Sequence, residues 1–157
     1  MSIKTLNVNK RVKFVSIQDD AIDQAKSNVE EYQKRYTESA ANKLLVFKEG
    51  ASPTWFEIGV LDGVRKGMIN DAMDEYEYEN GQVKRGKLNL NRRAVECIKY
   101  GLVNVVNGPQ VVKAKDSKGL EYVTDEYIKQ FPGSVIMELG GVIWKFFGEA
   151  DEDEKKE

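Results

Sequence analysis

Histidine is absent from this 157-residue sequence, and cysteine occurs once, as Cys97. The absence of histidine removes the commonest general base and the commonest metal ligand of proteins. A single cysteine cannot form a disulfide within the chain, and without imidazole it cannot build a zinc site. We therefore predict a protein that is not an enzyme and that uses no catalytic residue, metal or cofactor.

Long apolar runs and an excess of charge of one sign are also missing. No apolar stretch approaches the roughly 20 residues of a membrane span, and the opening MSIKTLNVNK lacks the apolar core of a signal peptide. With 24 basic and 26 acidic side chains the net charge is −2, so no global field attracts nucleic acid or anionic lipid. These features predict a cytoplasmic protein without a membrane partner.

The composition is that of a folded chain, because hydrophobic residues make up 41% and charged residues 32% of it. A chain of this length buries roughly 68–70% of its unfolded surface, so it needs no disulfide or metal to fold. We predict a single α+β domain over residues 1–148, in which a small antiparallel sheet of hairpins packs against several amphipathic helices. Residues 149–157 have almost nothing apolar to bury, and we expect a disordered acidic tail there.

Apolar residues spaced by three and four predict the helices. The clearest stripe, from Ile22 to Tyr36, predicts one long helix over residues 19–38. This helix packs either on the domain's own sheet, which we favour, or on a partner as a short coiled coil. Gly140 and Gly141 permit a kink or a close contact with another helix. The other predicted long helices cover residues 64–79, 91–106 and 132–147.

Alternating apolar residues and turn-forming segments predict the strands. In one strand Phe56 marks the core face, which leaves Trp55 near the polar side. The charged segment 77–87 contains two glycines and is expected to be a loop, and Thr124 is expected to cap a short helix that ends at Phe131. The predicted strands are residues 12–17, a hairpin of 44–47 with 54–61, and a hairpin of 111–114 with 120–123.

Few side chains are candidates for chemistry. Cys97 falls beside an apolar stripe, which indicates an inert, partly buried thiol. The carboxylates of residues 71–79 lack the ligand spacing of an EF-hand and indicate a solvated acidic face. Aromatic side chains are stronger candidates, because they dominate interface hot spots. The predicted protein-binding residues are Trp55, Trp144, Phe146 and Phe147; a second contact buried inside the domain is the plainer alternative for the C-terminal three.

A basic segment forms a second candidate site. It lies in the predicted loop and at the start of a helix, where phosphate contacts are physically sensible. Glutamates beside Tyr76 and Tyr78 would repel a nucleic-acid backbone, so nucleic acid is the less favoured partner. The candidate nucleic-acid-binding residues are Lys84, Arg85, Lys87, Arg92 and Arg93.

Three segments together resemble small morphogenesis proteins of tailed bacteriophages, of the kind called tail assembly chaperones or minor structural proteins. In GASPTWFEI, residues 50–58, proline and threonine precede an aromatic strand. In IKYGLVN, residues 98–104, a Gly-Leu pair ends a helix. In FPGSVIMEL, residues 131–139, a proline opens a helix that carries a Glu-Leu pair.

The resemblance implies a non-catalytic protein that binds other phage structural proteins. As a tail assembly chaperone, it would keep a tape measure or tail tube protein soluble in the cytoplasm of the infected host. As a permanent minor component, it would stay in the virion at the head, neck, capsid or tail. A small nucleic-acid-associated protein is the third alternative, and self-association into a homo-oligomer stays open.

Overall fold

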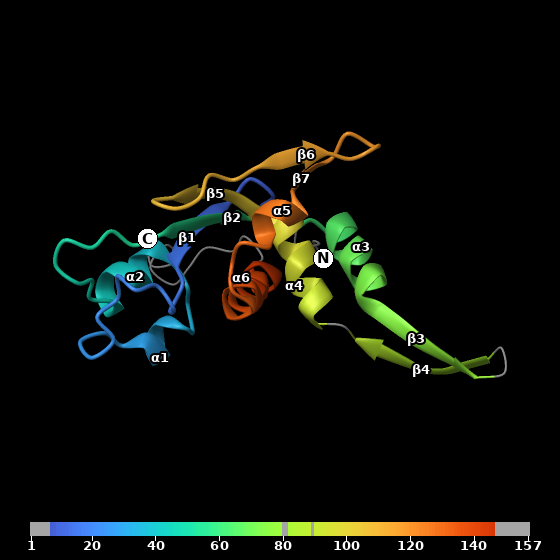
Figure 1. Ribbon diagram of the computed structural model, residues 1–157, viewed down its shortest axis with the longest axis horizontal. Helices are drawn as coiled ribbons and strands as arrows, with labels where there is room; N and C mark the ends of the chain where they lie inside the picture. Colours follow the sequence, from blue (N-terminus) through green and yellow to red (C-terminus); the bar gives the residue numbers. More distant parts are fainter. Residues whose placement is uncertain (1–6, 80–81, 89, 147–157) are drawn as a thin grey trace, which may run out of the picture.

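The computed structural model describes residues 7–79, 82–88 and 90–146, without the side chains of 72–90 (Figure 1). Its α+β architecture agrees with the class predicted from the sequence. The described strands are β1 (Arg11–Val15), β2 (Trp55–Gly59), β3 (Asp74–Glu79), β4 (Gln82–Leu88), β5 (Leu102–Val106), β6 (Lys113–Lys115) and β7 (Glu121–Val123). The described helices are α1 (Val29–Tyr32), α2 (Glu38–Leu44), α3 (Gly63–Met73), α4 (Leu90–Gly101), α5 (Asp125–Ile128) and α6 (Gly133–Lys145).

A three-stranded antiparallel sheet in the order β1-β2-β5 forms the centre of the fold. Successive side chains of a strand point to opposite faces, so the pairing register sorts the residues into apolar and polar rows. One row is apolar and buried: Phe14, Phe56 and Val105. The adjacent row is polar: Lys13, Glu57 and Asn104. The predicted core face of Phe56 is therefore confirmed.

Helices α4 and α6 pack closely together beside the apolar face of the sheet. Their approach depends on glycine, because a Cβ on Gly140 would lie 2.5 Å from the Cα of Ala94. A Cβ on Gly101 would similarly lie 2.3 Å from a methyl carbon of Ile143. The close helix contact predicted for the glycine pair in α6 is confirmed, and Gly140 is the member that makes it.

A smaller core cluster covers the other face at one end of the sheet. It is formed by Val15 of β1 and by apolar side chains of residues 22–45. The hydroxyl of Tyr32 lies 2.8 Å from both the backbone nitrogen and the carbonyl oxygen of Val15, so it accepts from one and donates to the other. A buried side chain thus satisfies polar backbone groups of β1 that would otherwise be costly to bury.

The predicted long helix over residues 19–38 is wrong. Asp19 accepts hydrogen bonds from the nitrogens of Ala21 and Thr54, both at 2.8 Å, so its carboxylate organises a turn and a contact with the segment before β2. The helical part is limited to α1, after which Tyr36 has a positive φ of 45°. A non-glycine residue in this conformation interrupts a right-handed helix, and α2 then begins separately.

Four other predictions are also corrected. The helix predicted over 64–79 ends at Met73 and continues directly as β3. The proposed hairpin of residues 44–47 with 54–61 does not form, because β2 pairs with β1 and β5, whereas Phe47 makes only an isolated bridge with Ile22. The predicted loop at 77–87 is largely the antiparallel pair β3–β4, with residues 80 and 81 outside the described part. The helix predicted over 91–106 ends at Gly101 and continues directly as β5.

The C-terminal half follows the sequence more closely. Strands β6 and β7 form the predicted second hairpin, and the side chain of Thr124 accepts from the nitrogen of Tyr127 as the predicted cap of α5. The predicted acidic tail at 149–157 lies outside the described residues. Among the described helices, none combines the length and apolar character that crossing a bilayer requires.

Candidate functional site

Glu138 of α6 connects the C-terminal helix to the N-terminal part of the chain. One carboxylate oxygen accepts a hydrogen bond from the hydroxyl of Ser16. The other accepts from the nitrogen of Ile17 at 2.9 Å and from the hydroxyl of Tyr36 at 2.7 Å. Burial and the neighbouring Glu138 carboxylate raise the pKa of Tyr36 well above its ordinary value, so the phenol stays protonated and remains a donor.

An open hollow of about 810 Å³ lies beside this network. It is bounded by the start of β1, by residues 33–37 between α1 and α2, and by α6 and Phe146. Its apolar lining comes from Val12, Tyr36, Met137, Val142 and Phe146. Its charged lining comes from Lys10, Arg11, Lys34, Arg35, Lys145 and Glu138. This combination can receive a ligand that is both negatively charged and partly apolar.

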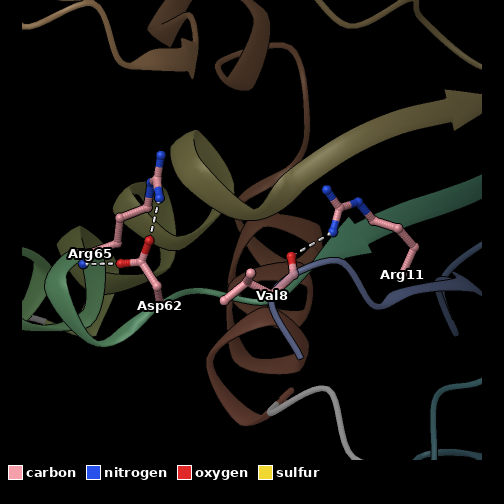
Figure 2. A network of polar contacts seen from close by, with 4 residues as sticks. All are labelled: Val8, Arg11, Asp62 and Arg65. Atoms are coloured by element: carbon pink, nitrogen blue, oxygen red, sulfur yellow. Dashed lines mark hydrogen bonds and ion pairs between the residues drawn. The ribbon is translucent and has the colours of Figure 1, made fainter. Parts of the chain in front are cut away.

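Arg11 is fixed at the edge of the hollow by backbone groups. Its guanidinium donates to the carbonyl oxygen of Val8 at 3.1 Å (Figure 2). It also donates to the carbonyl oxygen of Lys10 at 3.0 Å. It also lies against Gly59 of β2, where a Cβ would come within 3.0 Å of a guanidinium nitrogen. Because the carbonyl acceptors are neutral, these bonds orient the guanidinium without cancelling its charge.

Trp144, a predicted protein-binding residue, is held by contacts within the chain. The Nζ of Lys66 and the guanidinium carbon of Arg93 each lie 5.0 Å from its ring centroid, within the range of cation–π attraction. Lys66 also donates to the Trp144 carbonyl oxygen at 3.1 Å, and burial lowers the pKa of this lysine. These contacts agree with the plainer alternative of an internal contact; binding of a partner stays a prediction.

The other predicted aromatic residues do not gather around Trp144. Phe146 is half-buried against the larger core cluster and lines the hollow, whereas Phe147 lies outside the described residues. Trp55 is half-buried on the opposite face of β2 from Phe56, packs against the smaller cluster and has its ring centroid 6.4 Å from that of Phe47. The aromatic candidates therefore divide between two parts of the fold.

The basic candidates are placed on two elements. Lys84, Arg85 and Lys87 are in β4, whereas Arg92 and Arg93 are near the start of α4. The backbone register places Arg85 opposite Glu77 and Lys87 opposite Glu75. The acidic strand β3 thus lies beside the basic strand β4, and this pairing is a poor match to a uniformly anionic nucleic-acid backbone.

Cys97 is fully buried in α4, and burial raises the pKa of its thiol to about 12. A thiol that stays protonated at neutral pH is a weak nucleophile, in agreement with the predicted inert role. Within the part of the chain that the structure describes, no group of three or more cysteine or carboxylate side chains is placed to hold a metal ion.

The charged hollow and the Glu138 network were not predicted from the sequence. The one available signal is Glu138 itself, a carboxylate within the otherwise apolar segment 135–143. A charge in such a segment indicates a specific polar partner. Its partners come from residues more than 100 positions away along the chain, so periodicity could not identify them.

Comparisons of the chain with protein-family models, with curated proteins and with solved structures gave no match in any of the three.

Proposed function

We propose that the chain is a bacteriophage morphogenesis protein that acts by binding other proteins, in the manner of a tail assembly chaperone. The observation that supports a binding role best is the ribbon formed by β3 and β4. These strands pair with each other and make at most slight contact with the other described elements. Figure 1 shows them reaching away from the rest of the fold.

An isolated two-stranded ribbon is marginally stable in water. Each strand of such a ribbon has one edge whose N–H and C=O groups lack a neighbouring strand. An extended segment of another protein can pair with such an edge through backbone hydrogen bonds. The β3–β4 ribbon therefore has the geometry of a docking arm and is the surface on which we place partner binding.

The phage assignment rests on the resemblance of residues 50–58, 98–104 and 131–139 to morphogenesis proteins. On that basis the partner is the tape measure protein or the tail tube protein, and binding takes place in the infected cell. A permanent place in the head, neck or tail is the alternative, because the same ribbon can dock on an assembled particle.

The binding role is tested by co-expression with the structural proteins encoded beside this chain, followed by affinity capture. A variant of the otherwise complete chain in which a short Gly-Ser linker replaces residues 74–88 should capture the partner at least about tenfold more weakly, a loss of about 1.4 kcal/mol. A control variant with a shortened β6–β7 turn should capture it normally, and circular dichroism should show both variants folded. Equal capture by the ribbon variant would place binding elsewhere, and no capture by the unmodified chain would contradict the proposal.

Mass spectrometry of purified particles separates the two phage roles. A chaperone should be absent from the mature virion, because it leaves when its partner assembles. A structural component should be present in a fixed copy number. The second result would replace the chaperone role with the alternative.

A further inference from the structure

The hollow between β1, residues 33–37 and α6 has a strongly positive rim. Five basic side chains and one carboxylate line it, which gives the lining a net charge of +4. One of the five, the exposed Lys34, also forms an ion pair with Glu31 at 3.2 Å, which in water screens its charge only in part. The single carboxylate, Glu138, accepts hydrogen bonds from three donors of the chain. In a protein whose net charge is −2, this rim is a local concentration of positive charge that attracts anionic groups.

The interior of the hollow is partly apolar. Val12, Tyr36, Val142 and Phe146 line it and also pack against the larger core cluster. A simple inorganic anion would leave this apolar surface exposed to water. A peptide segment rich in carboxylates matches the charge of the rim, and its backbone and aliphatic side-chain carbons can cover part of the interior.

The sequence contains an acidic segment that begins three positions after Phe146. Residues 149–157 carry six carboxylate side chains and two lysines, a net charge of −4 that matches the +4 of the rim. Phe146, the last described residue, itself lines the hollow. The nine residues 149–157 alone can extend about 30 Å, which exceeds what is needed to cross a hollow of this volume.

We propose that this hollow is a binding site for the acidic C-terminal segment of the same chain, residues 149–157. The carboxylates of the segment lie against the rim formed by Lys10, Arg11, Lys34, Arg35 and Lys145. Covalent connection gives the segment a millimolar effective concentration at the hollow, so modest electrostatic attraction is sufficient. The site does not depend on the proposed phage role, since the hollow and the segment belong to one chain.

The site can be tested in the full-length protein with a fluorophore on a cysteine introduced by Ala150→Cys. Cys97 is fully buried with a raised thiol pKa, so the unmodified chain should take up no dye and serves as the labelling control. At about 0.01 M salt, where the Debye length is about 30 Å, we expect high fluorescence anisotropy. At about 1 M salt, where the Debye length is about 3 Å, the anisotropy should fall.

Charge reversal identifies the rim. Lys34→Glu combined with Lys145→Glu should lower the anisotropy at low salt to the value at high salt. Lys115→Glu combined with Lys118→Glu changes the net charge equally at exposed positions around the β6–β7 turn, and should leave the anisotropy unchanged. Both double variants should keep the melting temperature of the labelled parent, which excludes unfolding as the cause.

Three results would overturn the proposal. The first is low anisotropy that does not respond to salt, which would show that the segment does not bind. The second is an equal effect of the two double variants, which would show attraction to the general surface. The third is anisotropy that falls on dilution, which would show that the segment occupies the hollow of a second copy.

Discussion

Gly140 and Gly141 are neighbours in α6 with opposite surroundings. A Cβ on Gly140 would lie 2.5 Å from backbone atoms of Ala94, whereas a Cβ on Gly141 would meet nothing within 4 Å. We expect Gly140→Ala to lower the free energy of unfolding by about 1–3 kcal/mol, because α4 and α6 must move apart. Gly141→Ala should raise it by up to about 1 kcal/mol through helix propensity. Urea unfolding followed by circular dichroism measures both, and an equal effect of the two would contradict the packing of α4 on α6.

Tyr127 should make stability depend on alkaline pH. Burial raises the pKa of its phenol from 10.0 to about 12, so the folded protein keeps a proton that the unfolded chain loses. The free energy of unfolding should therefore fall between pH 10 and pH 12, by about 1.4 kcal/mol per pH unit for this group.

Tyr127→Phe separates this effect from the loss of a hydrogen bond. The variant should be less stable at neutral pH, because the hydroxyl donates to the carbonyl oxygen of Pro109 at 2.7 Å. Between pH 10 and pH 12 its stability should fall less steeply than that of the parent. Tyr122→Phe, at a half-exposed position in β7, is the control. If both variants keep the slope of the parent, Tyr127 is not the group responsible.

At the scale of single elements, Asp62 determines where α3 begins. One carboxylate oxygen accepts from the nitrogen of Arg65 at 2.7 Å, and the other forms an ion pair with the Arg65 guanidinium (Figure 2). We expect Asp62→Ala to cost about 1 kcal/mol of stability, because the helix loses its cap. Asp62→Asn keeps a capping oxygen and loses the ion pair, which is about one-third exposed and contributes little. Thermal unfolding should rank the alanine variant clearly below the asparagine variant, and equal losses would assign the effect to the ion pair.

Local chemistry predicted some elements and failed for others. The β6–β7 hairpin and the Thr124 cap follow from turn residues and capping preference, which act within a few positions. The helix predicted over 19–38 failed because hydrogen bonds of Tyr32 and Tyr36 to distant groups replaced the continuous helix. Their spacing of four is typical of a helix, but the positive φ of Tyr36 places the two side chains differently.

The same limit applies to the candidate sites. The sequence predicted aromatic protein-binding residues near the C-terminus, and one of them, Phe146, lines the hollow. The charged rim, however, joins residues from near position 10, position 34 and position 145. Only the packing of α6 beside β1 and residues 33–37 brings these charges together. No local pattern in the sequence predicts that packing, because the elements involved are far apart along the chain.

At the scale of the whole molecule, the central sheet and the β3–β4 ribbon differ in how much of the fold packs against them. Strand β2 lies between β1 and β5 and carries the buried residues Phe56 and Ile58. The β3–β4 ribbon has slight contact with the rest of the described fold. Because local opening is easiest where few contacts must be broken, the ribbon should open at a much lower free energy than β2.

Hydrogen exchange followed by mass spectrometry or NMR measures this difference. Backbone amides of Asp74–Glu79 and Gln82–Leu88 should exchange well before those of Trp55–Gly59 in the isolated protein. If the ribbon is the docking arm, addition of the partner should slow exchange in β3 or β4 and leave β2 unchanged, because a strand paired at the ribbon edge protects amides that were open to water. The β6–β7 hairpin, also two-stranded, is the internal comparison and should not change. Equal protection of the ribbon and β2 in the free protein would mean that the ribbon needs no partner to be stable, which removes the physical reason for placing binding there.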